Sequence, residues 1–452
     1  MWKRILIANR GEIALRIIRC CREMGIETVI VYSEEDRDSL PVLMAGKSIC
    51  IGKAKASQTY LNQETLIDCA KKTFCQAIHP GYGFLSENPD FAKKCEDNGL
   101  VFIGPNHQII KKMGNKQAAR ELMMAHGVRV VPGGAGLADT CAKALEDAKR
   151  IGFPVLIKAS AGGGGKGMRR VNCEKELEQA YRSARQEAKA AFGNDDVYVE
   201  KLILNPRHIE FQILADKHGN ILHLGERDCS IQKRNQKLLE EAPSPALDDT
   251  LRKQMGEMAV RAARAAGYDS VGTIEFILDE RGEFYFIEMN TRIQVEHPVT
   301  EMLTGIDLVK EQIRSAYGRR LTLTQDQVSF DGHVMECRIN AESSGLVKLL
   351  HFPAGYNVRT DSYLYNGCKV SPFYDSMVAK VIVKGSSRLE TIRRMRRALE
   401  ELIIEGIRTN EGIMHLLMFH KNFVKGDYTT HFWEEHSETL MQWNKEGSAD
   451  DK

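Results

Sequence analysis

The sequence predicts an α/β chain that becomes α+β in its middle part, with a parallel sheet first and antiparallel strands after it. Over residues 5–104, short apolar runs alternate with stretches of helical periodicity. From about residue 205 onward, strand patterns such as Ile209–Ala215 and Phe284–Met289 outnumber helical ones. Alternating strands and helices are typical of parallel sheets, whereas consecutive strands indicate antiparallel pairing.

The chain opens with a βαβ unit. The apolar run at residues 5–9 is followed by Ile13, Ile17 and Cys21 at helical spacing, and then by a second apolar run at residues 28–33. The same rhythm continues in further apolar runs at residues 48–51, 77–79 and 101–104. We therefore expect the first domain to end near residue 112.

Length and composition exclude several classes of protein. The chain has 452 residues, a net charge of +2 and 43% apolar residues, which suits a folded protein of roughly three domains. The near-neutral charge argues against nucleic acid as a partner, and no stretch approaches the roughly 18 uninterrupted apolar residues of a membrane helix. The cysteines form no Cys-x-x-Cys pair and the first residues lack the apolar run of a signal peptide, so we expect a cytoplasmic protein without a disulfide framework.

A glycine-rich segment at residues 161–167 follows a predicted strand at residues 154–158. It contains G-x-G-x-x-G, but the next residues, Met168–Val171, resemble a strand rather than a helix, which weakens both the Rossmann and the P-loop interpretations. A flap over phosphates remains, because consecutive glycines let backbone N–H groups approach phosphate oxygens and Lys158 supplies a positive charge. The alternative is a linker without a ligand.

A β-hairpin with two facing glutamates is the strongest local pattern. If Arg281-Gly282 is a two-residue turn, Glu275 lies directly opposite Glu288, and Asn290 shares their face. Two carboxylates about 5 Å apart repel, which favours a cation between them. Oxygen ligands without His or Cys indicate Mg²⁺ or Mn²⁺. The alternative is a solvated row of glutamates.

Arg292, Gln294 and Glu296 follow the hairpin within five positions. A guanidinium binds planar anions through paired hydrogen bonds, so this cluster suits an anion with a general base beside it. A structural ion pair is the alternative. Tyr82 stands between Gly81 and Gly83, where it either stacks on a flat ligand or closes a turn.

Several longer motifs occur in order along the chain: KRILIANRGEIALRI from Lys3, HPGYGFLSEN from His79, KASAGGGGKGMR from Lys158, EKLILNPRHIEFQ from Glu200, ERDCSIQKRNQKLLEEAP from Glu226, FIEMNTRIQVEHPVTE from Phe286 and HVMECRINAE from His333. With these motifs the sequence resembles the biotin carboxylases of the ATP-grasp superfamily, from Lys3 to about Asn410. IQVEHPVTE and ECRINAE separate this family from carbamoyl-phosphate synthases and amide ligases, which share only the nucleotide site.

The resemblance implies an ATP-grasp fold between an N-terminal Rossmann-like (pre-ATP-grasp) domain and a C-terminal biotin carboxylase domain. The expected boundaries are residues 1–112, 113–330 and 331–440, with a mobile lid at about 131–203. The residues that would contact ATP are Lys116, Lys158, Gly164, Gly165, Glu200, Lys201, Leu202, Ile203, His208, Gln232, Asn235 and Ile277.

The resemblance also implies how metal, bicarbonate and biotin bind. Two Mg²⁺ or Mn²⁺ ions on the phosphates of ATP would be held by Glu275, Glu288 and Asn290, in agreement with the hairpin. Bicarbonate would be held by Lys237, Arg292, Gln294 and Val295, with Glu296 as its general base. The biotin ring would face Arg338 and Tyr82. The implied catalytic set is Glu296, Arg338, Arg292 and Lys237.

The reaction that the resemblance implies explains why these residue types are needed. Glu296 would remove the proton of bicarbonate, while metals and lysines draw charge off the γ-phosphate that bicarbonate attacks. The resulting carboxyphosphate would break down to CO₂ and phosphate, and the phosphate would deprotonate biotin N1. Arg338 would stabilise the enolate-like oxygen of biotin, and a closed lid would exclude water from carboxyphosphate.

Two departures from the family pattern are visible. Asn235 stands where the family usually has His near the nucleotide ribose, which keeps hydrogen-bonding capacity without a titratable ring. After Glu342, the Asp-Pro and Phe-x-Pro-Ser-Pro-Gly segment is missing, and Ser343–Leu346 leads almost at once to His351. The shortened segment follows Arg338 closely, so it bears on biotin access and on subunit packing.

The expected function is ATP- and bicarbonate-dependent carboxylation of biotin, giving ADP, phosphate and carboxybiotin. Because the chain ends without a Met-Lys-Met biotinylation motif, we expect biotin to arrive on a separate biotin carboxyl carrier protein, with carboxyltransferase subunits as further partners. Acetyl-CoA carboxylase is the expected assembly, and the family is commonly homodimeric. The alternatives are a subunit of a pyruvate or other acyl-CoA carboxylase, or an ATP-binding regulatory or assembly subunit with impaired carboxylation.

Overall fold

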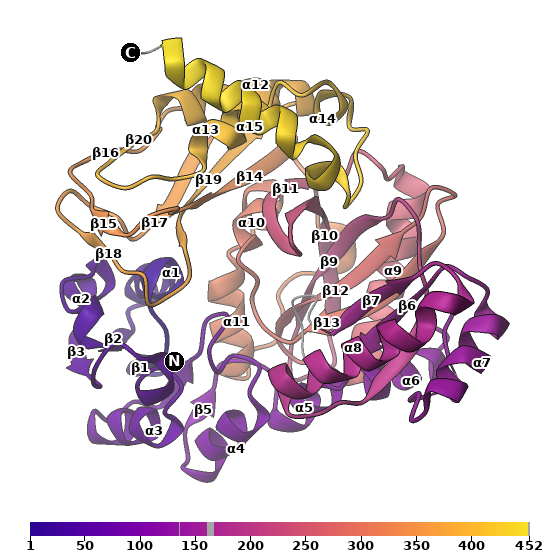
Figure 1. Cartoon of the computed structure of the whole chain (residues 1–452). Coiled ribbons are helices and arrows are strands. Elements are labelled where there is room, and N and C mark those ends of the chain that lie inside the picture. The colour runs from indigo at the N-terminus through magenta and orange to yellow at the C-terminus, as the bar shows by residue number, and fades with distance from the viewer. Residues whose placement is uncertain (135, 161–166, 451–452) are drawn as a thin grey trace.

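The structure is a computed structural model that describes residues 1–134, 136–160 and 167–450 (Figure 1). Gly164 and Gly165, which the sequence predicts to cover the phosphates, lie outside these residues. None of the helices in the described part of the chain combines the length and the apolar character that crossing a bilayer requires.

The N-terminal segment folds around a five-stranded parallel sheet in the order β3-β2-β1-β4-β5. Its strands are β1 (Arg4–Ile7), β2 (Glu27–Tyr32), β3 (Lys47–Cys50), β4 (Ala77–His79) and β5 (Val101–Phe102). The helices around them are α1 (Gly11–Glu23), α2 (Leu40–Met44), α3 (Gln63–Lys72), α4 (Pro89–Asp97) and α5 (His107–Gly114). The predicted βαβ opening and parallel sheet are therefore present.

Both faces of this sheet are covered, which explains the continuous apolar runs. Ile5 and Ile7 of β1 pack in one core with Ile13 of α1, whereas Leu6 packs on the other face with Leu66 of α3. Side chains alternate between the two faces of a strand, so a strand that is buried on both sides needs apolar residues at every position.

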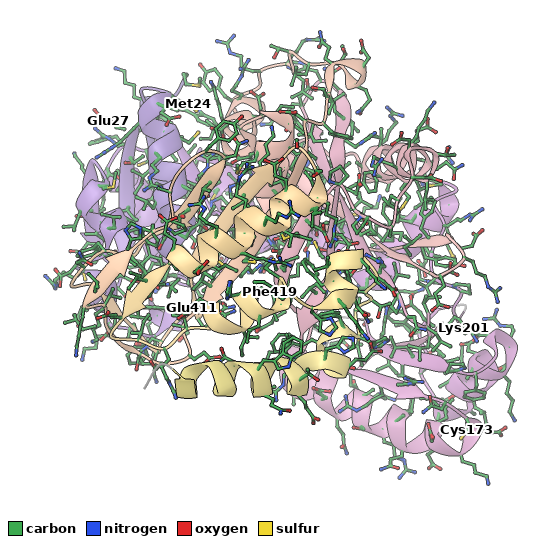
Figure 2. All side chains as sticks on the ribbon, turned by 90° about the horizontal axis from the view of Figure 1, so that it is seen from above. Met24, Glu27, Cys173, Lys201, Glu411 and Phe419 are labelled. Carbon is green, nitrogen blue, oxygen red and sulfur yellow. The ribbon has the colours of Figure 1, made fainter. Side chains whose placement is uncertain are left out.

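Residues 131–203 carry a small antiparallel sheet in the order β7-β6-β8. Its strands are β6 (Val155–Ala159), β7 (Met168–Val171) and β8 (Val197–Lys201), and helices α7 (Cys141–Ile151) and α8 (Glu174–Phe192) pack on them. The helix α6 (Lys116–Ala125) precedes this segment and packs beside α5. β7 is the strand expected after the glycine-rich segment. Figure 2 places Cys173 and Lys201 of this segment on the opposite side of the molecule from Met24 and Glu27.

The centre of the molecule is an eight-stranded antiparallel sheet in the order β13-β12-β9-β10-β11-β14-β19-β17. Its strands are β9 (Arg207–Ala215), β10 (Ile221–Lys233), β11 (Gln236–Ala242), β12 (Val271–Leu278), β13 (Phe284–Asn290), β14 (His333–Asn340), β17 (Val358–Ser362) and β19 (Met377–Gly385). β14, β17 and β19 follow residue 330, so one sheet crosses the boundary expected there.

Helices pack around this sheet, and the last of them form the upper edge of the molecule in Figure 1. They are α9 (Asp249–Ala266), α10 (His297–Thr304), α11 (Leu308–Ala316), α12 (Arg388–Glu401), α13 (Glu411–Leu417), α14 (Lys421–Lys425) and α15 (Phe432–Asp450). The remaining elements are short: β15 (Gly345–Leu346) with β18 (Lys369–Val370), β16 (Leu349–His351) with β20 (Ile403–Glu405), and the 3-10 turns Glu34–Asp36, Ala56–Gln58 and Gln325–Gln327.

Glu241 of β11 anchors the sheet to α12. Its carboxylate is fully buried and accepts hydrogen bonds from Arg388 Nε at 2.7 Å and Nη2 at 2.9 Å. His333 Nε2 lies 3.0 Å away, and the hydroxyl of Tyr428 also donates to it. Burial opposes ionisation, but the hydrogen bonds from His333 and Arg388 lower the pKa of Glu241 to about 2.

Glu241→Gln should destabilise the protein by about 3–5 kcal/mol, because it removes the buried anion of this ion pair and leaves the half-buried Arg388 without it. Urea unfolding at pH 7 measures the loss, and Glu390→Gln is the control, because Glu390 pairs with Arg394 on the surface of α12 and such pairs contribute under about 1 kcal/mol. The difference in unfolding free energy between the wild type and Glu241→Gln should shrink as pH falls from about 4.5 toward 2. A carboxyl whose pKa is lowered by folding stabilises the protein fully above that range and loses this stabilisation within it. Equal effects of the two substitutions would contradict the anchoring role.

Candidate active site

One cavity of about 980 Å³ opens between the N-terminal segment, residues 131–203 and the eight-stranded sheet. Every predicted site residue that the structure describes lines it: Tyr82, Lys116, Lys158, Glu200, Lys201, Leu202, Ile203, His208, Gln232, Asn235, Lys237, Glu275, Ile277, Glu288, Asn290, Arg292, Gln294, Val295, Glu296 and Arg338. Side chains predicted from motifs far apart in the sequence are thus brought to one place.

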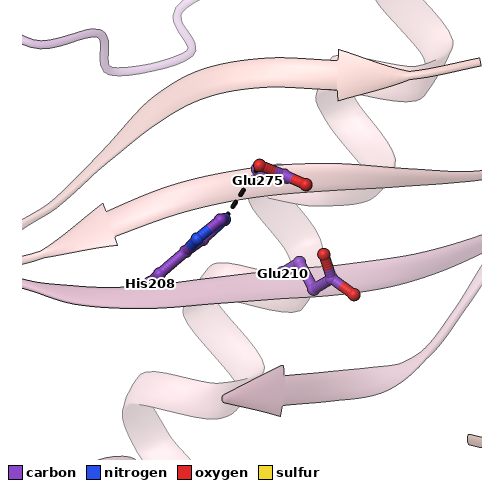
Figure 3. A group of neighbouring side chains, drawn as sticks. All are labelled: His208, Glu210 and Glu275. Atoms are coloured by element: carbon purple, nitrogen blue, oxygen red, sulfur yellow. Dashed lines mark hydrogen bonds and ion pairs between the residues drawn. The ribbon is translucent and has the colours of Figure 1, made fainter. Parts of the chain in front are cut away.

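Lys237 of β11 joins three carboxylates in this cavity. β9 presents His208 and Glu210 on the same face, because residues two apart in a strand point the same way (Figure 3). Lys237 Nζ lies 2.6 Å from Oε2 of Glu210, 2.6 Å from Oε1 of Glu296 and 3.4 Å from Oε1 of Glu275. The ammonium of Lys237 holds the three carboxylates together until a second cation competes for the carboxylates or an anion competes for Lys237.

The hairpin of β12 and β13 pairs Glu275 with Glu288, as predicted. The turn differs from the two-residue turn that we expected. The Asp279 backbone N–H donates to the Glu283 carbonyl and Gly282 has a φ of 80°, so the loop holds three residues with glycine in the left-handed region. A β-bulge just after Glu275 takes up the extra residue and restores the predicted register at the glutamates.

Nitrogen atoms of neighbouring side chains contact the paired glutamates. Asn290 Nδ2 donates to Oε1 of Glu275 at 2.7 Å, and His208 Nε2 lies 2.8 Å from its Oε2 (Figure 3). Oε2 of Glu288 lies 3.0 Å from Lys116 Nζ. Each carboxylate of the pair thus has its own nitrogen partner, which offsets the repulsion between them.

Glu296 precedes α10 and faces two cations. Its Oε2 accepts a hydrogen bond from Arg338 Nη2 at 2.9 Å, and Lys237 Nζ donates to its Oε1 at 2.6 Å. Arg338 also donates through Nε to Glu240 Oε1 at 2.7 Å. Burial opposes ionisation of Glu296, but Lys237 and Arg338 hold its pKa well below the ordinary value. Glu296 is therefore a carboxylate, the form that a general base requires.

Arg292 is fixed by three side chains. Its Nε donates to Glu87 Oε2 at 2.8 Å, its Nη1 to Gln294 Oε1 at 2.6 Å and its Nη2 to Asn290 Oδ1 at 3.3 Å. The planar guanidinium is thereby oriented along the wall of the cavity. Val295, the next lining residue, accepts a hydrogen bond at its carbonyl from Lys380 Nζ at 2.8 Å.

The side of the cavity nearest residues 131–203 combines lysines with apolar residues. Lys158 Nζ lies 2.7 Å from Glu200 Oε2. The ammonium of Lys201 donates instead to the backbone carbonyls of Gly152 and Phe153, at 2.9 and 3.2 Å, so its charge is used within the segment. Apolar lining comes from Leu202, Ile203 and Ile277.

Tyr82 closes a turn and also lines the cavity, and its stacking on a flat ligand stays a prediction. Gly81 and Gly83 have φ angles of 65° and 69°, a region that glycine enters at little cost. The Tyr82 hydroxyl donates to Glu12 Oε2 at 2.7 Å. Burial and the charge of Glu12 raise the pKa of Tyr82 well above its usual value, so the phenol remains neutral.

The two departures from the family pattern lie at turns. Arg234 and Asn235 connect β10 to β11 with φ angles of 53° and 62°, the conformation of a two-residue hairpin turn in which asparagine is favoured. The shortened segment folds as β15 and β16, and none of residues 343–351 lines the cavity. Arg338 therefore keeps its place in the wall.

Sequence reasoning missed three carboxylates that hold the predicted cations. Glu210 binds Lys237, Glu87 binds Arg292 and Glu240 binds Arg338. Glu210 lies two residues after His208 on one strand face, and Glu87 and Glu240 lie within the motifs HPGYGFLSEN and ERDCSIQKRNQKLLEEAP. Only the strand alternation at Glu210 points to the cavity, because Arg292 and Arg338, the partners of Glu87 and Glu240, come from positions far away in the sequence.

Comparison with known proteins identifies the family. Residues 1–110 match the model for the biotin carboxylase N-terminal domain, residues 336–435 that for the biotin carboxylase C-terminal domain, and residues 115–324 that for the ATP-binding domain of the carbamoyl-phosphate synthase L chain. The chain belongs to the biotin carboxylases. The predicted ATP-grasp fold is confirmed with it.

Relatives of this biotin carboxylase cover nearly its whole length. Biotin carboxylase 1 of Bacillus subtilis is 54% identical, covering 96% of this chain and 98% of the relative. A biotin carboxylase structure from Campylobacter jejuni has a TM-score of 0.95 at 46% identity, covering 96% and 99%. The biotin carboxylase domain dimer of the Hydrogenobacter thermophilus 2-oxoglutarate carboxylase, in complex with MgADP, ADP and bicarbonate, has a TM-score of 0.94 at 48% identity, covering 97% and 99%.

Proposed function

We propose that this biotin carboxylase attaches the carbon of bicarbonate to biotin on a separate carrier protein, with cleavage of ATP to ADP and phosphate. The supporting observation is that the carboxylate of Glu296, the cations Lys237 and Arg338, and the fixed guanidinium of Arg292 line the same cavity. A base, an anion site and a group that stabilises an oxyanion thus lie within reach of one substrate.

The metal that the family implies fits the donor set of the cavity. Glu275 and Glu288 stand opposite each other, and Asn290 contacts Glu275, so hard oxygen ligands meet without a thiolate, as Mg²⁺ and Mn²⁺ prefer. Glu275, Glu288 and Asn290 would hold the ions, which when bound neutralise charge on the phosphates of ATP. Lys116 and Lys158 add positive charge on the same wall.

Bicarbonate binding would make Glu296 a better base. Lys237 is the cation that lowers the pKa of Glu296 most. An anion held by Arg292 and Gln294 that also attracts Lys237 would loosen the Lys237–Glu296 pair and raise the basicity of the carboxylate. Glu296 then accepts the proton of bicarbonate, and the carbonate oxygen is free to attack the terminal phosphate of ATP.

Arg338 and Tyr82 supply the biotin side of the reaction. Arg338 is held by Glu240 and Glu296, which fixes its guanidinium before the ureido oxygen gains negative charge, and a fixed donor requires little reorganisation during the reaction. Tyr82 is a neutral phenol anchored by Glu12, so it presents a flat polar surface to the ring. Exclusion of water from this cavity protects carboxyphosphate.

The assembly remains part of the proposal. We expect a biotin carboxyl carrier protein and carboxyltransferase subunits as partners, a homodimer, and acetyl-CoA carboxylase as the complex. Solved relatives at 48% identity include the biotin carboxylase subunit of pyruvate carboxylase, so a keto acid remains the alternative acceptor. Domain boundaries at residues 112 and 330 and a cytoplasmic location also stay predictions, since both bacterial and chloroplastic relatives exist.

Arg338→Gln tests the proposed function. The substitution should cost on the order of 10² to 10³ in the rate of biotin carboxylation, as for removal of an oxyanion donor. Bicarbonate-dependent ATP cleavage without biotin should fall much less, because Arg338 acts on biotin. Both rates are measured on the same preparation, with Arg397→Gln as a control because Arg397 pairs with Glu401 on the exposed side of α12.

Two results would change the conclusion. If Arg338→Gln lowers both rates equally, Arg338 does not serve biotin selectively. If the wild type cleaves ATP with bicarbonate but carboxylates neither free biotin nor a biotinylated carrier, the regulatory alternative is favoured, and the shortened segment after Glu342 becomes the first region to restore.

A further inference from the structure

Two glutamates face each other behind Arg338. Glu240 of β11 is the register partner of Glu336 of β14, and directly opposed residues in an antiparallel pair have Cβ atoms about 5 Å apart. Both side chains are fully buried. Arg338 lies two residues beyond Glu336 on β14, so all three share one face of the sheet.

The hydrogen bonds of this pair are unequal. Oε1 of Glu240 accepts from Arg338 Nε at 2.7 Å. Oε2 of Glu240 and both oxygens of Glu336 accept no hydrogen bond from any residue that the structure describes. A buried carboxylate without donors is costly, whereas a protonated carboxyl in the same place is not.

The surroundings offer Glu336 no cation of its own. Lys380 lies opposite Arg338 on β19, but its Nζ is 3.1 Å from Glu12 Oε2 and donates to the Val295 carbonyl. The other charged or titratable groups that act on the pair are Arg338 on β14, Lys237 on β11, Glu296 before α10, Tyr82 of the N-terminal segment, and the buried thiols Cys229 on β10 and Cys337 on β14. Apolar residues Val299 and Leu303 of α10 cover the neighbouring positions of the sheet.

Burial raises the pKa of both carboxyls, against the attraction of nearby cations. The pKa of Glu240 is raised to about 7 despite Arg338, and that of Glu336 is raised well above the ordinary value despite Lys380. Facing carboxyls that cannot both ionise titrate as a pair, as two carboxylates that share a site do.

We propose that Glu240 and Glu336 hold one proton between them, carried by Glu336, and that the single negative charge left on Glu240 positions Arg338. With both carboxyls neutral, Arg338 would pair with Glu296 alone and lose one of the two anions that fix its guanidinium. With Glu240 ionised, the guanidinium is held between the two glutamates, in the orientation proposed for the ureido oxygen of biotin. The positioning role rests on the proposed function, whereas the shared proton does not.

Thermal unfolding of Glu336→Gln from pH 5 to pH 8 tests the proton. A carboxyl whose pKa is raised by folding stabilises the folded state less and less as pH rises above the unfolded value, and glutamine has no proton to lose. The Tm of Glu336→Gln relative to the wild type should therefore rise across this range. Glu390→Gln, on the surface of α12, should show a constant offset, because the hydrogen bond from Ser386 lowers the pKa of Glu390 and its partner Arg394 does not titrate in this range. A flat or falling difference for Glu336→Gln would overturn the proposal.

Glu240→Gln tests the positioning of Arg338. The ratio of biotin carboxylation to bicarbonate-dependent ATP cleavage should fall about 10- to 100-fold, the loss found when a residue that orients a metal ligand is removed. In the wild type this ratio should decrease as pH falls through about 7, and in Glu240→Gln it should be low at every pH. If Glu240→Gln keeps both the ratio and the pH profile of the wild type, the positioning role is overturned. Absence of ATP cleavage in the wild type would instead contradict the proposed function, and the unfolding result would stand by itself.

Discussion

Glu288→Lys is expected to abolish bicarbonate-dependent ATP cleavage and leave the fold intact. Glu288 stands opposite Glu275 in the cavity, with Lys116 Nζ 3.0 Å from its carboxylate. The substitution removes an oxygen ligand and places an ammonium where the proposed Mg²⁺ ions would lie, beside another lysine. About 31% of the Glu288 side chain is exposed, so a lysine head group reaches solvent without disturbing the core. ADP release with Mg²⁺ and bicarbonate is the measurement.

Glu283→Lys is the matched control for this experiment. Glu283 lies on the turn of the same hairpin and pairs with Arg129 on the surface, and exposed pairs contribute little. The same change of charge should therefore leave ATP cleavage close to the wild-type rate. Turnover near the wild-type level in Glu288→Lys itself would remove the metal assignment.

The facing glutamates show what a sequence pattern determines in a strand. Because side chains alternate, a register error of one residue would have moved Glu275 to the other face. The predicted pairing of Glu275 with Glu288 was right, although the predicted turn was too short. The bulge that corrects for the longer turn has no signal in the sequence, since its position depends on how the two strands twist together.

The carboxylates that contact Lys237, Arg292 and Arg338 show where sequence reasoning ends. The strand alternation that places His208 in the cavity also predicts that Glu210 lies on the same face. The contact of Glu240 with Arg338 could not be predicted in this way, because it depends on the pairing of β11 with β14. Nothing local predicts which strands become neighbours in a sheet that crosses residue 330. Motifs locate the groups that face a ligand, whereas the groups behind them follow from long-range pairing.

Glu296→Ala should lower the carboxylation of free biotin by about 10² to 10⁴, the contribution of a positioned general base, while ATP binds almost normally. Glu296 is 1% exposed and its two oxygens contact Lys237 and Arg338. Alanine removes the proton acceptor and leaves both cations without this partner. Steady-state rates give the loss of catalysis, and calorimetric titration with ATP gives the loss of affinity.

Two further variants separate the loss of the base from the loss of structure. Glu296→Gln keeps the shape of the side chain but accepts no proton, so it should lose nearly as much rate as alanine with a smaller change in Tm. Glu301→Gln alters another buried carboxylate of α10, one held by Arg16 and Arg359 outside the cavity, and should lower Tm while keeping the rate. If Glu296→Ala loses ATP affinity by the same factor as it loses rate, or if Glu296→Gln retains the rate, Glu296 holds Lys237 and Arg338 in place and is not the base.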